Sequence, residues 1–166
     1  MREYVVTCCS TADMSRTFME TNEVPFAMFH YQLDGKEYAD DLYSSISPEV
    51  FYKMIGDGAQ PVTSQVNAEA YCALFEPVLK SGKDVLHLTL SSGISGSINS
   101  ANVAKTQMEE KYPDRRVMVV DSLAASSGYG MLVEQTLENQ RAGMSLEENA
   151  AWIAVSYTHL RAHETA

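Results

Sequence analysis

The chain has 166 residues, of which 45% are hydrophobic and 20% charged, and its formal net charge is −10. These values are typical of one globular domain with a substantial core. The acidic balance and the absence of a basic patch argue against a nucleic-acid partner. No apolar run is long enough to span a bilayer and no signal peptide is recognisable, so the sequence predicts a cytoplasmic protein without membrane insertion. Cys8, Cys9 and Cys72 lack metal-ligand spacing and are predicted to be reduced thiols.

Short apolar runs alternate with helical patterns along the chain. In chain order, the predicted elements are a strand at 3–8, a short helix at 15–20, a strand at 25–33 with a hairpin return at 36–39, helices at 48–56 and 68–80, a strand at 85–89, a helix at 98–111, a strand at 117–120, a helix at 126–142 and a last helix from Ser145. Ser47-Pro48-Glu49 and Ser145–Glu148 are typical helix starts, and Asn67 is a predicted cap. This alternation predicts an α/β fold with a mostly parallel sheet and helices on both faces.

Four polar segments are predicted to meet at the carboxyl edge of this sheet, where parallel sheets bind ligands. They are residues 9–13, 63–65, 91–97 and 121–122. The segment Ser91–Ser97, with the sequence Ser-Ser-Gly-Ile-Ser-Gly-Ser, connects a strand to a helix. Backbone N–H groups, hydroxyls and the helix dipole at such a junction favour a phosphate, a carboxylate or an oxyanion. The simpler alternative is that these serines and glycines only form a turn and cap the helix.

Enzymatic motifs around this loop are incomplete. A nucleophile elbow requires a glycine two residues after the serine, but Ser95 is followed by Gly96 and then Ser97. No lysine follows Gly96, as a P-loop would require. His30 and His87 lie in apolar strands and are predicted to be core residues, not general bases. The sequence therefore predicts no catalytic residue, metal or cofactor; the alternative is a phosphotransferase or kinase-like enzyme acting on a small phosphorylated substrate.

Two other motifs are predicted to have structural roles only. Gly128 and Gly130 lack the third glycine of a dinucleotide-binding fingerprint, so they are expected to serve helix packing. Asp40 and Asp41 are adjacent acids in a loop and are expected to face water.

Taken together, the motifs resemble the DegV family over residues 4–153. The resemblance rests on Thr63-Ser64-Gln65, the loop at 91–97, Val120-Asp121-Ser122 with Gly128 and Gly130, the opening Ser10–Asp13 and the turn Gly35–Tyr38 with its following acids. It implies a protein that binds a long-chain fatty acid and presents it to a separate fatty acid kinase, and that is not itself an enzyme.

The resemblance also implies which residues hold the ligand. By analogy with the family, Thr63 and Ser95 would bind the acyl carboxylate, and the loop around Gly96 would add backbone N–H donors. The other residues expected at this site are Ser64, Ser92 and Ser122.

This sequence departs from the family pattern in several places. Cys9 stands where the family usually has aspartate, and Ser97 stands where it usually has threonine. The family also has a second domain, which carries a histidine near the ligand, so residues 1–153 are expected to be an N-terminal domain whose C-terminal partner is missing. Residues 154–166 lose the pattern and are predicted to be a tail of foreign origin that adds nothing to the core. His159 and His163 within it are not expected to bind metal.

Overall fold

The computed structural model describes the backbone of residues 2–164 and the side chains through residue 156. The strands are β1 (Tyr4–Cys9), β2 (Phe26–Ala27), β3 (His30–Leu33), β4 (Lys36–Ala39), β5 (Val62–Ser64), β6 (Asp84–Thr89) and β7 (Val117–Asp121). The helices are η1 (Ser10–Ala12), α1 (Arg16–Thr21), α2 (Pro48–Gly56), α3 (Ala68–Lys80), α4 (Ser97–Lys111), α5 (Ser126–Arg141) and α6 (Leu146–Glu164). Two sheets result, with strand orders β2-β1-β6-β7 and β4-β3-β5.

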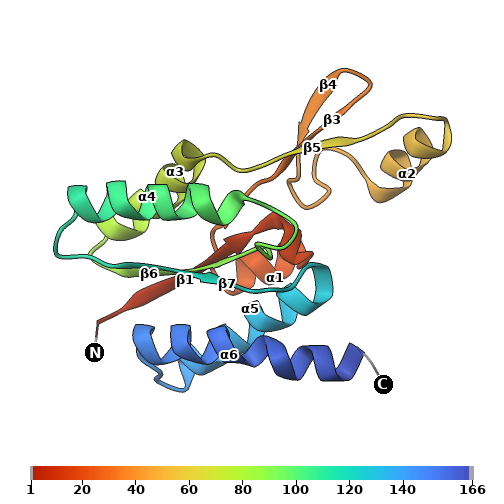
Figure 1. The fold of residues 1–166 in the computed structure, drawn as a ribbon. Helices are drawn as coiled ribbons and strands as arrows, with labels where there is room; N and C mark the ends of the chain where they lie inside the picture. The colour runs from red at the N-terminus through yellow and green to blue at the C-terminus, as the bar shows by residue number, and fades with distance from the viewer. Residues whose placement is uncertain (1, 165–166) are drawn as a thin grey trace.

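The first sheet is parallel and lies between two layers of helices. Helices α3 and α4 cover one face, and α5 and α6 cover the other (Figure 1). Strand β6 is central and all six of its residues are buried, which explains why its sequence is mostly apolar. It pairs in parallel with β1 and with β7. This arrangement confirms the predicted α/β fold with helices on both faces of a parallel sheet.

Local sequence signals fix where several helices begin. The side chains of Ser47 and Asn67 each accept a hydrogen bond from the backbone N–H three residues later. Before α6, the Ser145 N–H donates to the Glu148 carboxylate at 2.9 Å, and the Glu148 N–H donates to the Ser145 hydroxyl at 3.3 Å. These contacts satisfy N–H groups that a helix cannot pair internally, so the predicted caps and the predicted capping box are confirmed.

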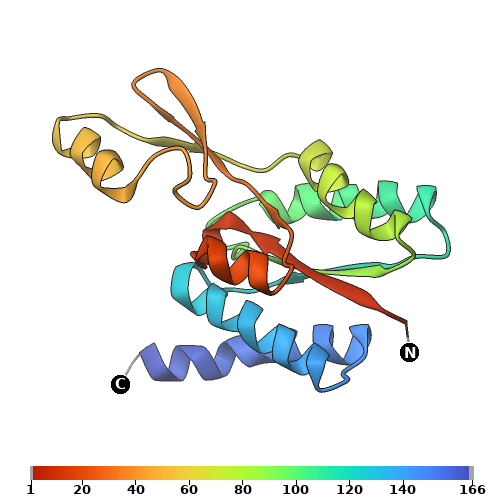
Figure 2. The ribbon, with the colours of Figure 1, turned by 180° about the vertical axis from the view of Figure 1, so that it is seen from behind.

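The second sheet and α2 form a unit, which we call the arm (residues 30–64), that projects from the parallel sheet (Figures 1 and 2). The hairpin of β3 and β4 was expected, and its turn residues Asp34 and Gly35 have φ values of 52° and 76°. The single strand predicted at 25–33 is wrong, because β2 pairs with β1 whereas β3 pairs within the arm. The polar loop predicted at 63–65 is partly a strand, β5, which places Thr63 opposite Tyr31.

Helix α6 continues to Glu164, beyond the point at which the sequence pattern fades. Ser156 is only 6% exposed, and its hydroxyl donates to the Trp152 carbonyl oxygen at 2.7 Å. The prediction that everything after residue 153 adds nothing to the core is therefore wrong for Ser156. The side chains of His159 and His163 lie outside the described part of the chain, and the foreign origin of residues 154–166 stays a prediction. Across residues 2–164, no helix combines the length and hydrophobicity needed to cross a bilayer.

Gly130 lets α5 approach the turn that follows β1. A Cβ atom at this position would lie 2.7 Å from the Ala12 carbonyl oxygen and 2.6 Å from the Met14 Sδ atom. No ordinary side chain fits that space. The helix-packing role predicted for this glycine is confirmed.

Candidate functional site

The loops that follow β6 and β7 meet at the carboxyl edge of the parallel sheet, as predicted. The Ser91 N–H donates to the Ala124 carbonyl oxygen at 3.1 Å. One oxygen of the Asp121 carboxylate accepts the N–H groups of both Ser92, at 3.1 Å, and Leu123, at 2.9 Å. The Asp121 side chain and this main-chain hydrogen bond together hold the two loops.

The Ser91–Ser97 loop forms a tight turn that ends at the amino terminus of α4. The N–H groups of Ile94 and Ser95 both donate to the Ser91 carbonyl oxygen at 3.1 Å. The Ser95 hydroxyl oxygen accepts from the Ser97 N–H at 3.2 Å, which leaves its own proton available to an anion. Within the described residues, nothing accepts from the Gly96 N–H. The positive end of the helix dipole strengthens these donors toward a negative ligand.

The end of β5 reaches this loop from the arm. A Cβ atom placed on Gly96 would lie 3.0 Å from the Gln65 Oε1 atom, so the Gln65 amide rests against the glycine. Ser64 is exposed, and its hydroxyl donates to the His30 carbonyl oxygen at 3.4 Å. Thr63 is also exposed, and its hydroxyl makes no hydrogen bond to the described residues. The structure thus joins the 63–65 segment to the Ser/Gly loop through the contact between Gln65 and Gly96.

The two remaining predicted residues occupy different positions. The Ser92 side chain is exposed at the rim of the loop. Ser122 is fully buried, and its hydroxyl both accepts from the Ala124 N–H at 3.2 Å and donates to the Ala124 carbonyl oxygen at 3.1 Å. Ser122 therefore stabilises the turn after β7, while Ser92 stands where a ligand can reach it.

His87 belongs to the core, as predicted. Its Nδ1 atom lies 2.9 Å from the Thr7 hydroxyl, and its ring packs edge-on against Tyr71 and Phe75. Burial lowers the pKa of His87 to about 3. The imidazole is neutral at physiological pH and has no access to solvent, so it cannot serve as a general base at the loop.

Cys9 is also buried and takes part in the same polar network. Its N–H donates to the Tyr129 hydroxyl at 3.0 Å, and that hydroxyl donates to the Leu88 carbonyl oxygen at 2.5 Å. Burial raises the pKa of the Cys9 thiol. Cys9 is therefore an uncharged part of the core.

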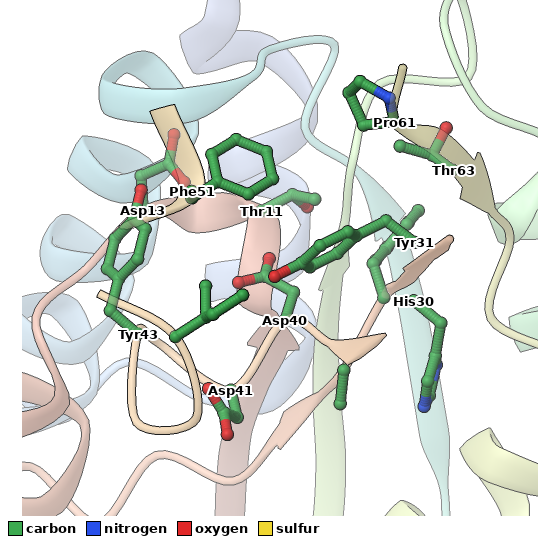
Figure 3. A pocket seen from close by; sticks show the side chains of 13 residues that line it. Thr11, Asp13, His30, Tyr31, Asp40, Asp41, Tyr43, Phe51, Pro61 and Thr63 are labelled. Carbon is green, nitrogen blue, oxygen red and sulfur yellow. The ribbon is translucent and has the colours of Figure 1, made fainter. Parts of the chain in front are cut away.

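A cavity of about 270 Å³ lies beside the arm, and the sequence did not predict it. Its wall combines residues after β1, residues of β3, the loop after β4, helix α2 and the start of β5 (Figure 3). Thr63 forms part of this wall. His30 is half-buried and also lines the cavity, so the prediction that it is a core residue is wrong.

Three aspartates line the same cavity. Asp40 and Asp41 are half-buried there, which contradicts the prediction that they simply face water. Burial raises the pKa of Asp40, and the charges of Asp13 and Asp41 raise it further. The backbone of Asp13 is left-handed, with φ of 52°, as is that of Tyr43 on the wall, with φ of 63°. No set of three or more His, Cys, Asp or Glu side chains in the described part of the chain is placed to hold a metal ion.

Comparisons with known proteins identify relatives over nearly the whole chain. The sequence model of the DegV family, described as uncharacterised proteins, matches residues 5–164. A DegV domain-containing protein of Clostridium perfringens is 33% identical over 153 residues, which are 92% of this chain and 53% of that protein.

Two solved structures show the same fold. A DegV family protein from Thermus thermophilus, described by its fatty acid binding, is 30% identical, with a TM-score of 0.84 over 95% of this chain and 54% of that one. A stearic acid-binding protein from Eubacterium ventriosum is 28% identical, with a TM-score of 0.82 over 90% of this chain and 52% of that one. The chain spans about half the length of the relatives it matches. With a family match from residue 5 to residue 164, this chain belongs to the DegV family.

Proposed function

We propose that this chain binds the carboxylate of a long-chain fatty acid at the amino terminus of α4 and presents it to a fatty acid kinase. The observation that carries the proposal is the arrangement at Ser95 and Gly96, where a hydroxyl proton and an N–H group remain free to donate at the positive end of a helix. Neutral donors of this kind bind a carboxylate without a basic residue. The segment Ser91–Ser97 contains no lysine or arginine.

The surroundings of the loop favour an amphiphile over a small phosphorylated molecule. Ile94 is 67% exposed and Leu123 is 42% exposed, and both project from loops that the Asp121 carboxylate holds together. Exposed apolar side chains beside an anion site suit a ligand with a charged head and an alkyl chain. The fatty-acid-binding relatives from Thermus thermophilus and Eubacterium ventriosum support this choice.

Each residue of the site has a distinct role in this proposal. Thr63 and Ser95 donate their hydroxyl protons to the carboxylate, and Gly96 donates its N–H. Ser64 and Ser92 lie at the rim. Ser122 acts indirectly by stabilising the neighbouring turn. The chain then acts as a carrier in the cytoplasm, with no catalytic residue of its own, and the chemistry belongs to the kinase.

The first prediction concerns affinity for palmitate, measured by calorimetry on this chain. Removing a hydroxyl that bonds a charged group costs about 1.5–3 kcal/mol, which lowers affinity by roughly ten- to a hundredfold. We expect this loss for Ser95→Ala and for Thr63→Val. Thr63→Val is the sharper variant, because the Thr63 hydroxyl makes no hydrogen bond to the described residues and its loss costs the free protein little. The double variant should lose less than the sum of the single losses, since both hydroxyls would bond one carboxylate.

Thr106→Val is the matched control. Thr106 is exposed on α4, several turns from its amino terminus, and its hydroxyl bonds only within the helix, at 3.2 Å to the Asn102 carbonyl oxygen. This variant should bind palmitate as the unaltered chain does. Undiminished affinity in both Thr63→Val and Ser95→Ala would refute the proposed residues. Binding of inorganic phosphate without binding of palmitate would refute the fatty-acid proposal itself.

A further inference from the structure

The cavity beside the arm holds two carboxylates, those of Asp13 and Asp40, that form no ion pair in the described part of the chain. No lysine or arginine of that part of the chain lines the cavity. Asp41 differs from these two aspartates: although burial acts in the opposite direction, hydrogen bonds from Ser45 and Ser44 and the charge of Arg16 lower its pKa. Mutual repulsion between these carboxylates is part of the reason that the pKa of Asp40 is raised, after burial itself. A cation in the cavity would relieve that repulsion.

Aromatic rings supply much of the remaining wall. Tyr31 stacks on Tyr38 with ring centroids 5.5 Å apart and meets Phe51 edge-on at 5.4 Å. In Figure 3, Asp40 lies next to the Tyr31 ring, and Tyr43 stands on the same side as Asp13. Burial raises the pKa of Tyr31, and the charge of Asp40 is the next cause. Carboxylates beside aromatic faces favour an organic cation, through charge and through cation–π attraction.

Thr11 is a second, independent sign of a ligand. Its hydroxyl oxygen is buried and has no hydrogen-bond partner in the described structure, and Thr11 lines the cavity. Buried hydroxyls in folded proteins nearly always have a partner. A ligand with hydrogen-bond donors would provide one.

The size of the cavity limits the choice of cation. A volume of about 270 Å³ accommodates one long side chain. A single metal ion is disfavoured, because the carboxylates are not arranged as a metal-binding group in the described residues. Guanidinium is planar, weakly hydrated and able to stack on aromatic rings while bonding two carboxylates, unlike an ammonium group.

We propose that this cavity, walled by Asp13, Asp40, Tyr31, Tyr43 and Phe51, binds the guanidinium group of an arginine side chain on a partner protein. The location of the cavity favours a partner protein over a free small molecule, because Thr63, which we propose binds the fatty acid carboxylate, lies in the same wall. This argument rests on the proposed function: a kinase that reaches a carboxylate beside Thr63 approaches a chain of net charge −10, and positive charge on the kinase would favour that approach.

The arginine titration needs neither a fatty acid nor a kinase, so its result is independent of the palmitate experiment. The chain, labelled with nitrogen-15, is titrated with N-acetyl-arginine amide and, separately, with the citrulline analogue, which is neutral and of nearly the same shape. We expect saturable shifts of the amide signals around the cavity with arginine, and at least tenfold weaker binding with citrulline. Raising the salt concentration should weaken arginine binding.

Variants of this chain complete the test. Asp40→Asn and Asp13→Asn should each weaken arginine binding at least threefold, and asparagine tolerates the left-handed backbone at position 13. Asp57→Asn is the control, because Asp57 is exposed, pairs with Lys53 and lies outside the cavity. Equal shifts with citrulline, or arginine binding that both cavity variants leave intact, would overturn the proposal. So would decanoate shifting the same signals while arginine does not, because the cavity would then be an acyl pocket.

Discussion

Removing the Tyr129 hydroxyl tests how strongly its buried hydrogen bonds stabilise the carboxyl edge of the sheet. Tyr129 is fully buried, and its hydroxyl connects the Cys9 N–H at the end of β1 to the Leu88 carbonyl oxygen in β6. Tyr129→Phe keeps the ring and leaves both backbone groups buried and unpaired. Each unpaired group costs about 1–3 kcal/mol, so the unfolding free energy should fall by about 2–6 kcal/mol. A domain of this size loses roughly 2–4 °C of melting temperature for each kcal/mol.

Urea unfolding followed by circular dichroism measures this loss directly. Tyr112→Phe is the matched control, because the Tyr112 hydroxyl bonds the Glu76 carboxylate at 2.7 Å near the surface, where water can replace it. That variant should lose less than about 1 kcal/mol. Equal unfolding free energies for the two variants would refute the conclusion that the buried hydrogen bonds of Tyr129 stabilise the fold more than the surface hydrogen bond of Tyr112.

Two further predictions concern buried positions. Gly130→Ala should destabilise the chain by about 1–3 kcal/mol, because the new methyl group would clash with the Ala12 carbonyl oxygen. Gly56→Ala is the control: a methyl group there has open space, so this variant should be as stable as the unaltered chain. Equal melting temperatures for the two variants would contradict this reasoning. His87 should stay neutral in the folded protein down to about pH 4, as measured by NMR titration of its ring, because burial lowers its pKa from 6.5 to about 3. Since the unfolded chain binds this proton more readily, the contribution of His87 to stability is complete above pH 6.5 and is lost as the pH falls toward 3; an imidazole titrating near pH 6 in the folded state would refute this.

Sequence patterns predict the parallel sheet well, because the signals for it are local. A mostly apolar run predicts β6, and Asn67 and the serine before Pro48 mark where helices begin. The position of the Ser91–Ser97 loop follows from the same logic, since it connects a buried strand to a helix. Its convergence with the loop at Asp121 follows from the parallel order of β6 and β7.

The arm could not be predicted in the same way, because it depends on pairing between distant residues. Strand β5 has only exposed residues, so no apolar periodicity marks it, and it exists because Tyr31 and Thr63 lie opposite each other. The break between β2 and β3 has no proline or glycine to signal it. The cavity was missed for the same reason: Thr11 and Asp40 line it together only because the arm folds over the turn after β1.

The contrast between β5 and β6 has a consequence for how tightly a ligand can be held. Strand β6, which leads to Ser95, is fully buried, whereas the strand that carries Thr63 is exposed and its neighbour α2 has no buried residue. Segments with so little burial open at a small fraction of the global unfolding free energy. An anion that contacts both Ser95 and Thr63 would therefore restrict the motion of the arm when it binds. The entropy lost in this way would lower the observed affinity below the value expected from the contacts alone.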